Sequence, residues 1–190
     1  PFAAHGLRAS LHGSLAFTGI GHATDRASIL GLAGFLPDSY DPDKAEAALV
    51  RIRETGTIAV PGLPPLAFDP ARDLVFDYGP ALPGHANGMI LRALDAQGDV
   101  IAQETYYSIG GGFVLTAAEL AEGEAARPRA DCPWPFETAA QMLEMAQVSG
   151  LSIAAMRRAN ELAFRSAAEV DRGLARIWEV MNACISRGMA

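Results

Sequence analysis

A histidine lies in a glycine turn near the start of the chain, within residues 19–25 (GIGHATD). Residues 7–17, which precede the turn, are typical of a β-strand, and an apolar run that follows it indicates a helix. Glycines permit a sharp turn, Thr24 and Asp25 are helix-capping types, and imidazole exchanges protons near neutral pH. The pattern predicts His22 as a proton-transfer group beside a carboxylate-attracting helix N-terminus. A common glycine turn with a structural histidine is the alternative.

A second candidate segment is residues 82–89 (LPGHANGM), where His85 and Asn87 flank a Pro-Gly bend. The amide of Asn87 offers two donors and one acceptor, which suits a carboxylate or an ammonium group. A plain turn, with Asn87 and Gly88 in positive-φ conformations, explains the same residues.

A third segment, residues 104–113 (ETYYSIGGGF), is a β-branched and aromatic run that ends in Gly110, Gly111 and Gly112. Consecutive glycines expose backbone N–H groups that a small anion could fill. A bulge or a flexible loop tip is the alternative.

These residues must be positioned by strands and helices. The order of the expected elements predicts an α+β fold, with a mainly antiparallel sheet, followed by an all-helical segment. We expect a domain at residues 1–126, a proline-bearing linker at 127–136 and helices at 137–190. The expected strands are 7–17, 74–78, 89–94 and 100–107, with a loop at 60–70. The expected helices are 24–32, 43–54, 118–124, 137–148, 152–165 and 167–187.

Composition excludes several classes of protein. Half of the 190 residues are hydrophobic, which indicates a globular chain, and the net charge of −7 disfavours nucleic acids and anionic membranes. No apolar run has the length of a membrane helix, and no signal-peptide pattern opens the chain, so we expect a cytoplasmic protein.

The three segments, in this order, resemble the iron–sulfur-dependent L-serine dehydratases (L-serine ammonia-lyases). The family motifs are Y-G-S-L-x-x-T-G-x-G-H-x-T-D, H-x-N-G-M and T-Y-Y-S-[IV]-G-G-G-F. The matching residues are 12–15, 18–19, 21–22 and 24–25, then His85 and 87–89, then 105–113. The resemblance covers the beta-chain-like part and the start of the catalytic alpha domain, from about residue 7 to residue 189.

The resemblance implies a lyase that converts L-serine to pyruvate and ammonia. It implies that His22 is the base that removes the α-proton, and that Thr24 orients His22 or the substrate. Substrate would be bound by His85, Asn87 and the glycines at 110–112. The partners expected are L-serine, the remaining catalytic domain or subunit, and further copies in a homo-oligomer. Serine and threonine are not distinguished, because one methyl group changes binding by only about 1–3 kcal/mol.

The resemblance also implies a [4Fe–4S] cluster, which needs at least three thiolates. Cys132 and Cys184 are the only cysteines of the chain, so the cluster ligands are expected outside it. The family usually has Lys at the position of Ile20 and Tyr at that of His12, and a Ser-Ser-His-Thr segment that is absent before Gly6. We therefore expect the sequence to be an excerpt or a processed product.

A non-catalytic serine-sensing domain is the main alternative, since the α+β half also resembles the allosteric serine-binding domain of some phosphoglycerate dehydrogenases. The helices after residue 135 favour the dehydratase, because they continue its pattern. An interaction domain without a ligand would leave the His and Gly residues unexplained.

Overall fold

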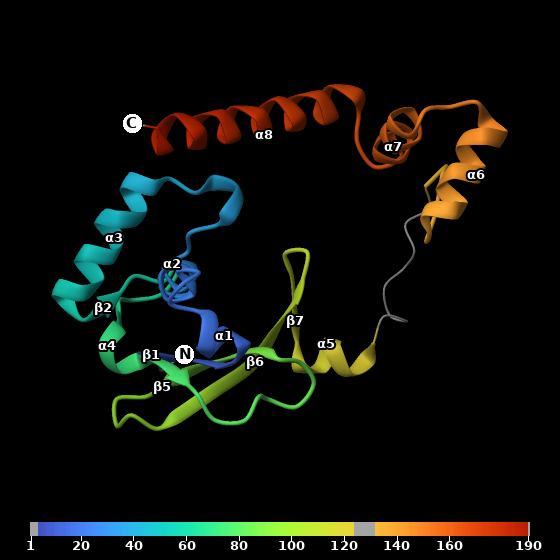
Figure 1. Cartoon of the computed structure of the whole chain (residues 1–190). Helices are drawn as coiled ribbons and strands as arrows, with labels where there is room; N and C mark the ends of the chain where they lie inside the picture. The colour runs from blue at the N-terminus through green and yellow to red at the C-terminus, as the bar shows by residue number, and fades with distance from the viewer. Residues whose placement is uncertain (1–3, 124–131, 190) are drawn as a thin grey trace. The chain divides into compact units, whose positions relative to one another are not determined.

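The computed structural model describes residues 4–123 and 132–189, and the chain divides into two compact units at residues 1–126 and 127–190. The first unit is α+β and the second is helical, which confirms the fold class predicted from the sequence (Figure 1). Two expected features lie outside the described residues in part: Glu124 of the helix at 118–124, and residues 127–131 of the linker.

The described residues of the first unit form a seven-stranded sheet in the order β2-β3-β1-β5-β6-β7, with β4 also paired to β1. The strands are β1 Gly6–Gly13, β2 Thr57–Ile58, β3 Leu66–Ala67, β4 Leu74–Asp77, β5 Asn87–Leu94, β6 Val100–Gly110 and β7 Phe113–Thr116. β1 runs parallel to β3 and β4, and the other pairs are antiparallel. β1 is therefore the strand on which both halves of the sheet are built.

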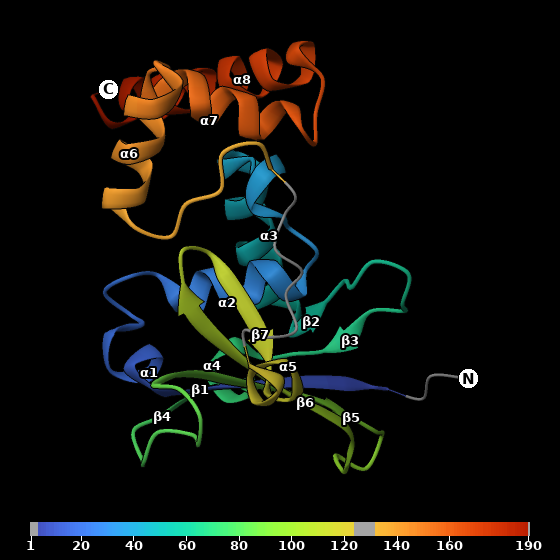
Figure 2. The ribbon, with the colours of Figure 1, turned by 90° about the vertical axis from the view of Figure 1, so that its right-hand side faces the viewer.

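Helices cover one face of this sheet, where α2 and α3 lie side by side (Figures 1 and 2). The helical segments are α1 Ser14–Thr18, α2 Thr24–Leu32, the 3-10 turn η1 Pro37–Ser39, α3 Pro42–Thr55, α4 Pro70–Asp73 and α5 Ala117–Glu122. Ala9 and Leu11 of β1, both fully buried, pack with Ile29 of α2 and Leu49 of α3 in the main core. This burial fixes the helices, and hence the turn before α2, against the central strand.

The first strand is shorter than the predicted 7–17, because the chain leaves the sheet at Gly13. Gly13 has φ +57° and ψ −130°, a backbone conformation that disfavours any side chain. A Cβ there would lie 2.3 Å from the carbonyl oxygen of Ala86, and the amide of Ser14 donates to that same oxygen at 2.8 Å. The prediction that residues 14–17 continue the strand was wrong, because this tertiary contact ends β1 and the chain forms the short helix α1 there.

The two predicted helix starts of the first unit have different outcomes. Ala23 at φ 54°, and not Thr24 or Asp25, is the N-cap of α2, and no side chain caps that helix, so the predicted N-cap is wrong. Asp25 does lie in the first turn of α2, where a negative charge favours a helix start. Asp41 does cap α3, because its carboxylate accepts from the amides of Asp43 at 3.1 Å and Lys44 at 3.2 Å.

The second unit contains α6 Ala139–Ser149, α7 Ile153–Leu162 and α8 Ala167–Gly188. Thr138, Ser152 and Ser166 cap these helices, and Gly150 ends α6 in the left-handed conformation. Across residues 4–123 and 132–189, no helix has both the length and the apolarity needed to cross a membrane.

We expect Gly13→Ala to lower the free energy of unfolding by about 3 kcal/mol, because it adds backbone strain and a clash with Ala86. Gly56→Ala is the matched control: Gly56 also has positive φ, at +62°, but a Cβ there meets nothing within 4 Å. We expect that control to cost about 1 kcal/mol. Urea denaturation followed by circular dichroism measures both, and equal losses would contradict the role given to the Ala86 contact.

Candidate functional site

His22 lies in the exposed turn between α1 and α2. Its ring atom Nδ1 is 2.9 Å from the carbonyl oxygen of Thr18. A carbonyl oxygen can only accept a hydrogen bond, so Nδ1 carries the hydrogen and neutral His22 has its lone pair on Nε2. The turn therefore presents a proton acceptor to solvent, which is what a general base requires.

His85 has the opposite tautomer. The backbone amide of Asn87 donates to Nδ1 of His85 at 3.1 Å, so in the neutral ring the hydrogen is on Nε2. The side-chain amide of Asn87 donates to the carbonyl oxygen of Ser108 at 3.2 Å, which ties this loop to β6. The half-buried pair of His85 and Asn87 thus offers an N–H donor and an amide oxygen acceptor.

The segments that hold His22 and His85 are connected through β1 and α1. Gly13 at the end of β1 pairs with Asn87 at the start of β5, and Ser14 binds the carbonyl oxygen of Ala86. α1 then leads directly to Thr18, which holds the ring of His22. In the part of the chain that is described, no hydrogen bond joins His22 to His85 or Asn87.

The three glycines form the turn of the β6–β7 hairpin. Gly110 pairs with Phe113, and Gly110, Gly111 and Gly112 all have positive φ, at 95°, 63° and 83°. Two residues with positive φ at a two-residue hairpin turn favour glycine. The turn accounts for the glycines by itself, and a role in binding an anion stays a prediction.

Thr24 is the first residue of α2, two positions after His22. Its amide donates to the carbonyl oxygen of Gly19 at 2.8 Å, and its own carbonyl oxygen accepts from the hydroxyl of Ser28 at 2.7 Å. These bonds close the turn that carries His22. The predicted action of Thr24 on His22 or on a substrate stays a prediction.

A row of polar side chains, of which Ser10 and His12 are buried, crosses the other face of the sheet and was not predicted from the sequence. His12 Nε2 is 2.9 Å from the hydroxyl oxygen of Ser10, and His12 Nδ1 is 3.5 Å from Asp77. Arg92 donates to Ser10 at 3.1 Å and to Gln103 at 2.8 Å. The alternation of polar residues at 8, 10 and 12 of the first strand was the signal that could have indicated it.

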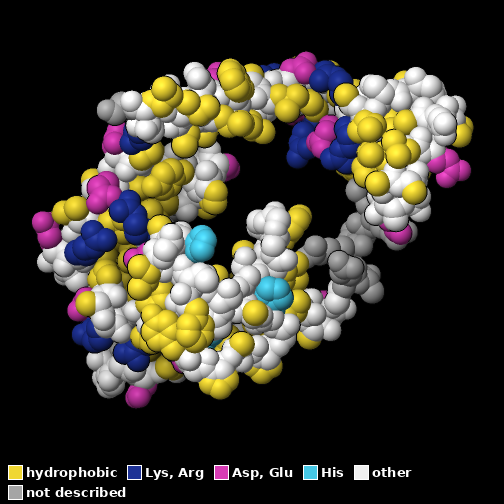
Figure 3. Space-filling view, viewed as in Figure 1, with side chains coloured by type: hydrophobic (Ala, Val, Ile, Leu, Met, Phe, Trp, Pro, Cys, Tyr) yellow, Lys and Arg dark blue, Asp and Glu magenta, His cyan; other side chains and the backbone are white. Residues whose placement is uncertain are grey.

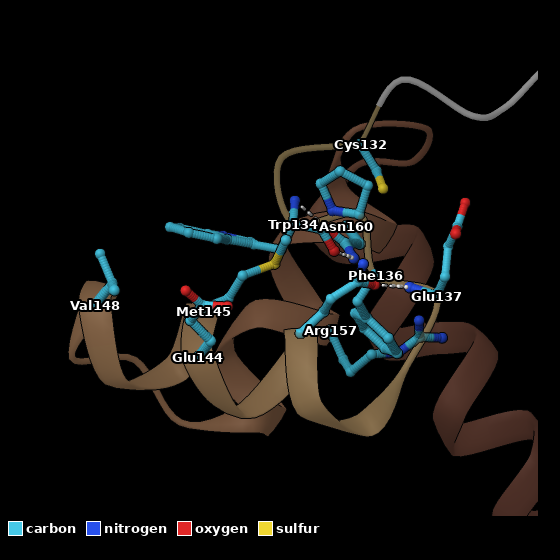
Figure 4. A pocket seen from close by; sticks show the side chains of 11 residues that line it. Cys132, Trp134, Phe136, Glu137, Glu144, Met145, Val148, Arg157 and Asn160 are labelled. Atoms are coloured by element: carbon cyan, nitrogen blue, oxygen red, sulfur yellow. Dashed lines mark hydrogen bonds between the residues drawn. The ribbon is translucent and has the colours of Figure 1, made fainter.

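Cavities are also present in the second unit, and none of the predicted site residues lines them. One of about 750 Å³ is lined by Trp134, Met145 and Arg157, and Asn160 holds the backbone of Trp134 there with two hydrogen bonds of 2.8 Å (Figure 4). Histidine side chains are visible instead on the open surface of the first unit (Figure 3). The candidate site is thus a surface and not a closed pocket.

The described residues do not fit an iron–sulfur cluster. Within residues 4–123 and 132–189, no group of three or more His, Cys, Asp or Glu side chains could hold a metal ion. Cys132 and Cys184 are both free thiols, and two thiolates do not satisfy a cluster.

Comparison with known proteins agrees with the ordered motifs. A family model described as "Serine dehydratase beta chain" matches residues 3–119. An L-serine dehydratase of Streptomyces coelicolor is 40% identical over 183 residues, which are 96% of this chain and 40% of that protein. L-serine dehydratase TdcG of Escherichia coli is 40% identical over 94% of this chain and 39% of its own length. The L-serine dehydratase of Haemophilus influenzae is 33% identical over 96% of this chain and 40% of its own.

This chain therefore belongs to the serine dehydratase beta chain family. It spans about two fifths of the length of the curated relatives that it matches, and the match continues through the helical unit.

The tautomers give a direct test of the site. We expect neutral His22 to carry its hydrogen on Nδ1 and neutral His85 on Nε2, because Thr18 and Asn87 fix them. Long-range proton–nitrogen NMR correlation of the imidazole rings at mildly alkaline pH distinguishes the two forms. A hydrogen on Nε2 of His22 would remove the basis for its role as a base.

Proposed function

We propose that this chain is the serine-binding and proton-transferring part of an L-serine dehydratase, a lyase that converts L-serine to pyruvate and ammonia. The observation that carries the proposal is the opposite tautomers of His22 and His85, one an acceptor and one a donor. The names of the relatives supply the substrate.

In this proposal Nε2 of His22 removes the α-proton of serine. The Nε2–H of His85 donates to the substrate carboxylate, and the amide oxygen of Asn87 accepts from its ammonium group. Loss of the proton and of the β-hydroxyl, together one water, yields aminoacrylate, and hydrolysis of aminoacrylate gives pyruvate and ammonia. The glycines at 110–112 would add backbone donors.

We propose further that residues 137–190 begin the catalytic domain and that residues 127–136 link it to the first domain. Leu174, Ile177, Trp178, Met181 and Ile185, at helical spacing on α8, are each more than half exposed. Apolar side chains line this helix in Figure 3. An apolar stripe of this kind is typical of a surface that another element covers. The covering element would be the remaining domain or subunit, which would also contain the ligands of the iron–sulfur cluster.

A domain that closes over His22 would also exclude water from the reaction, since the turn is exposed in this chain. A homo-oligomer and a cytoplasmic location, both expected from the sequence, remain predictions under this proposal.

In the complete enzyme, we expect His22→Ala to lower kcat for pyruvate formation by about 10²–10⁴-fold, because the base is lost. Iron content and the visible absorbance of the cluster should not change. Arg51→Ala, which truncates an exposed side chain on α3, is the control and should keep wild-type turnover. Activity of His22→Ala near that of the control would overturn the assignment.

A serine-sensing domain is the second candidate, and the exposure of the turn that holds His22 favours it. Under this alternative the same residues bind serine without removing its proton. Turnover that survives His22→Ala, together with serine binding at His85 and Asn87, would select sensing over catalysis.

Calorimetric titration of L-serine into this chain tests the binding half of the proposal. We expect Asn87→Ala to weaken binding about tenfold, since one hydrogen bond to a charged ligand group is lost. Asn182→Ala, on the exposed surface of α8, is the matched control and should bind as the wild type does. Equal affinities for the two variants would show that serine does not bind at Asn87.

A further inference from the structure

A second concave surface lies at the opposite end of β1 from the candidate site. A cavity of about 530 Å³ is lined by Gly6 and Arg8 of β1, by Arg72 and Asp73 of α4, and by the turn at residues 94–98. The candidate site begins at Gly13, seven residues along the same strand. The cavity is therefore separate from the residues given roles in serine chemistry.

One buried carboxylate serves two arginines in this cavity. Asp73, which is 2% exposed, accepts from Arg72 Nε at 3.1 Å and Nη2 at 2.8 Å, and from the amide of Asp69 at 2.9 Å. Burial raises the pKa of Asp73, but the hydrogen bonds from Arg72 and Asp69 outweigh burial and hold it below its ordinary value. Asp73 is thus ionised, and its oxygens are already occupied.

Arg8 is left without a full partner. Its Nη2 is 3.7 Å from Asp73, beyond a hydrogen bond, and its buried Nε has no hydrogen-bond partner among the described residues. Arg8 also lies directly opposite Arg92 in the β1–β5 register, and like charges at such positions repel. Arg92 donates to the neutral side chains of Gln103 and Ser10, so these hydrogen bonds do not reduce its positive charge.

The charged side chains that line the cavity are two arginines, Arg8 and Arg72, and two carboxylates, Asp73 and Asp95. Asp95 accepts from the amides of Gln97 and Asp99, both at 2.9 Å, and so caps its own turn. Arg72 is hydrogen-bonded to Asp73, whereas among the described residues no hydrogen bond joins Arg8 to either carboxylate. A guanidinium with unused N–H donors at a concave surface indicates an anionic ligand.

We propose that this cavity binds a small oxyanion, a carboxylate or a phosphate group, through the guanidinium group of Arg8. A guanidinium presents paired N–H donors whose spacing matches the oxygens of either group. The volume is that of a small-molecule site, so the oxyanion is one end of a small organic ligand.

Titrations of inorganic phosphate and of propionate into the whole chain, at constant ionic strength, test the proposal. Calorimetry gives the affinity, and amide NMR shows whether residues 94–98 respond. Binding of phosphate alone assigns a phosphorylated ligand, binding of propionate alone assigns a carboxylate, and binding of both assigns the shared oxyanion chemistry. Binding of neither anion overturns the proposal.

Arg8→Gln should weaken binding about tenfold, because a charge-assisted hydrogen bond is lost. Arg51→Gln, an equal charge change on the exposed side of α3, should leave binding unaltered. Arg8→Lys keeps the charge but not the paired donors, so it should also weaken binding. It takes the place of Arg8→Gln in the test if that variant does not fold. Equal losses of affinity in the Arg8 and Arg51 variants would show that the anion is attracted non-specifically, and they would overturn the proposal. His85→Ala should leave anion binding unchanged, which separates this result from any failure of the serine site.

Discussion

The close approach of Gly13 to the carbonyl oxygen of Ala86 is the contact on which the candidate site depends. A strand that continued straight past Gly13 would carry residues 14–22 away from β5. Because only a residue without a Cβ fits there, β1 ends and α1, which leads to the turn that holds His22, begins at the loop that holds His85. One carbonyl oxygen thus links two segments whose histidines lie 63 positions apart in the sequence.

The central strand β1 has two different faces, and a different kind of interaction stabilises each of them. Ala9 and Leu11 bury apolar surface against α2 and α3, where the hydrophobic effect acts without direction. Ser10 and His12 lie on the other face, where buried polar atoms need specific partners on β4 and β5. The apolar face holds the helices in place, and the polar face fixes which strands lie beside β1.

The sequence predicted features that depend on local chemistry. The cap at Asp41, the stop at Gly150 and the cap at Ser152 each act within a few residues, and each is present. Features that depend on distant partners were not predicted. Residues 14–17 have strand-like composition, yet Ala86 converts them to helix, and β7 is a short edge strand whose pairing depends on β6. The motifs found His22, His85 and Asn87, but only the structure gives their tautomers.

An added proton would act differently at the two rings. At His22 it would occupy the lone pair on Nε2 and remove reactivity while the turn keeps its bond to Thr18. At His85 it would occupy Nδ1, the atom that accepts the Asn87 amide, and two N–H donors would then face each other. The lone pair on Nδ1 of His85 is therefore part of the structure of the loop, which also holds Asn87 beside Gly13, whereas the lone pair on Nε2 of His22 supports no bond of its turn.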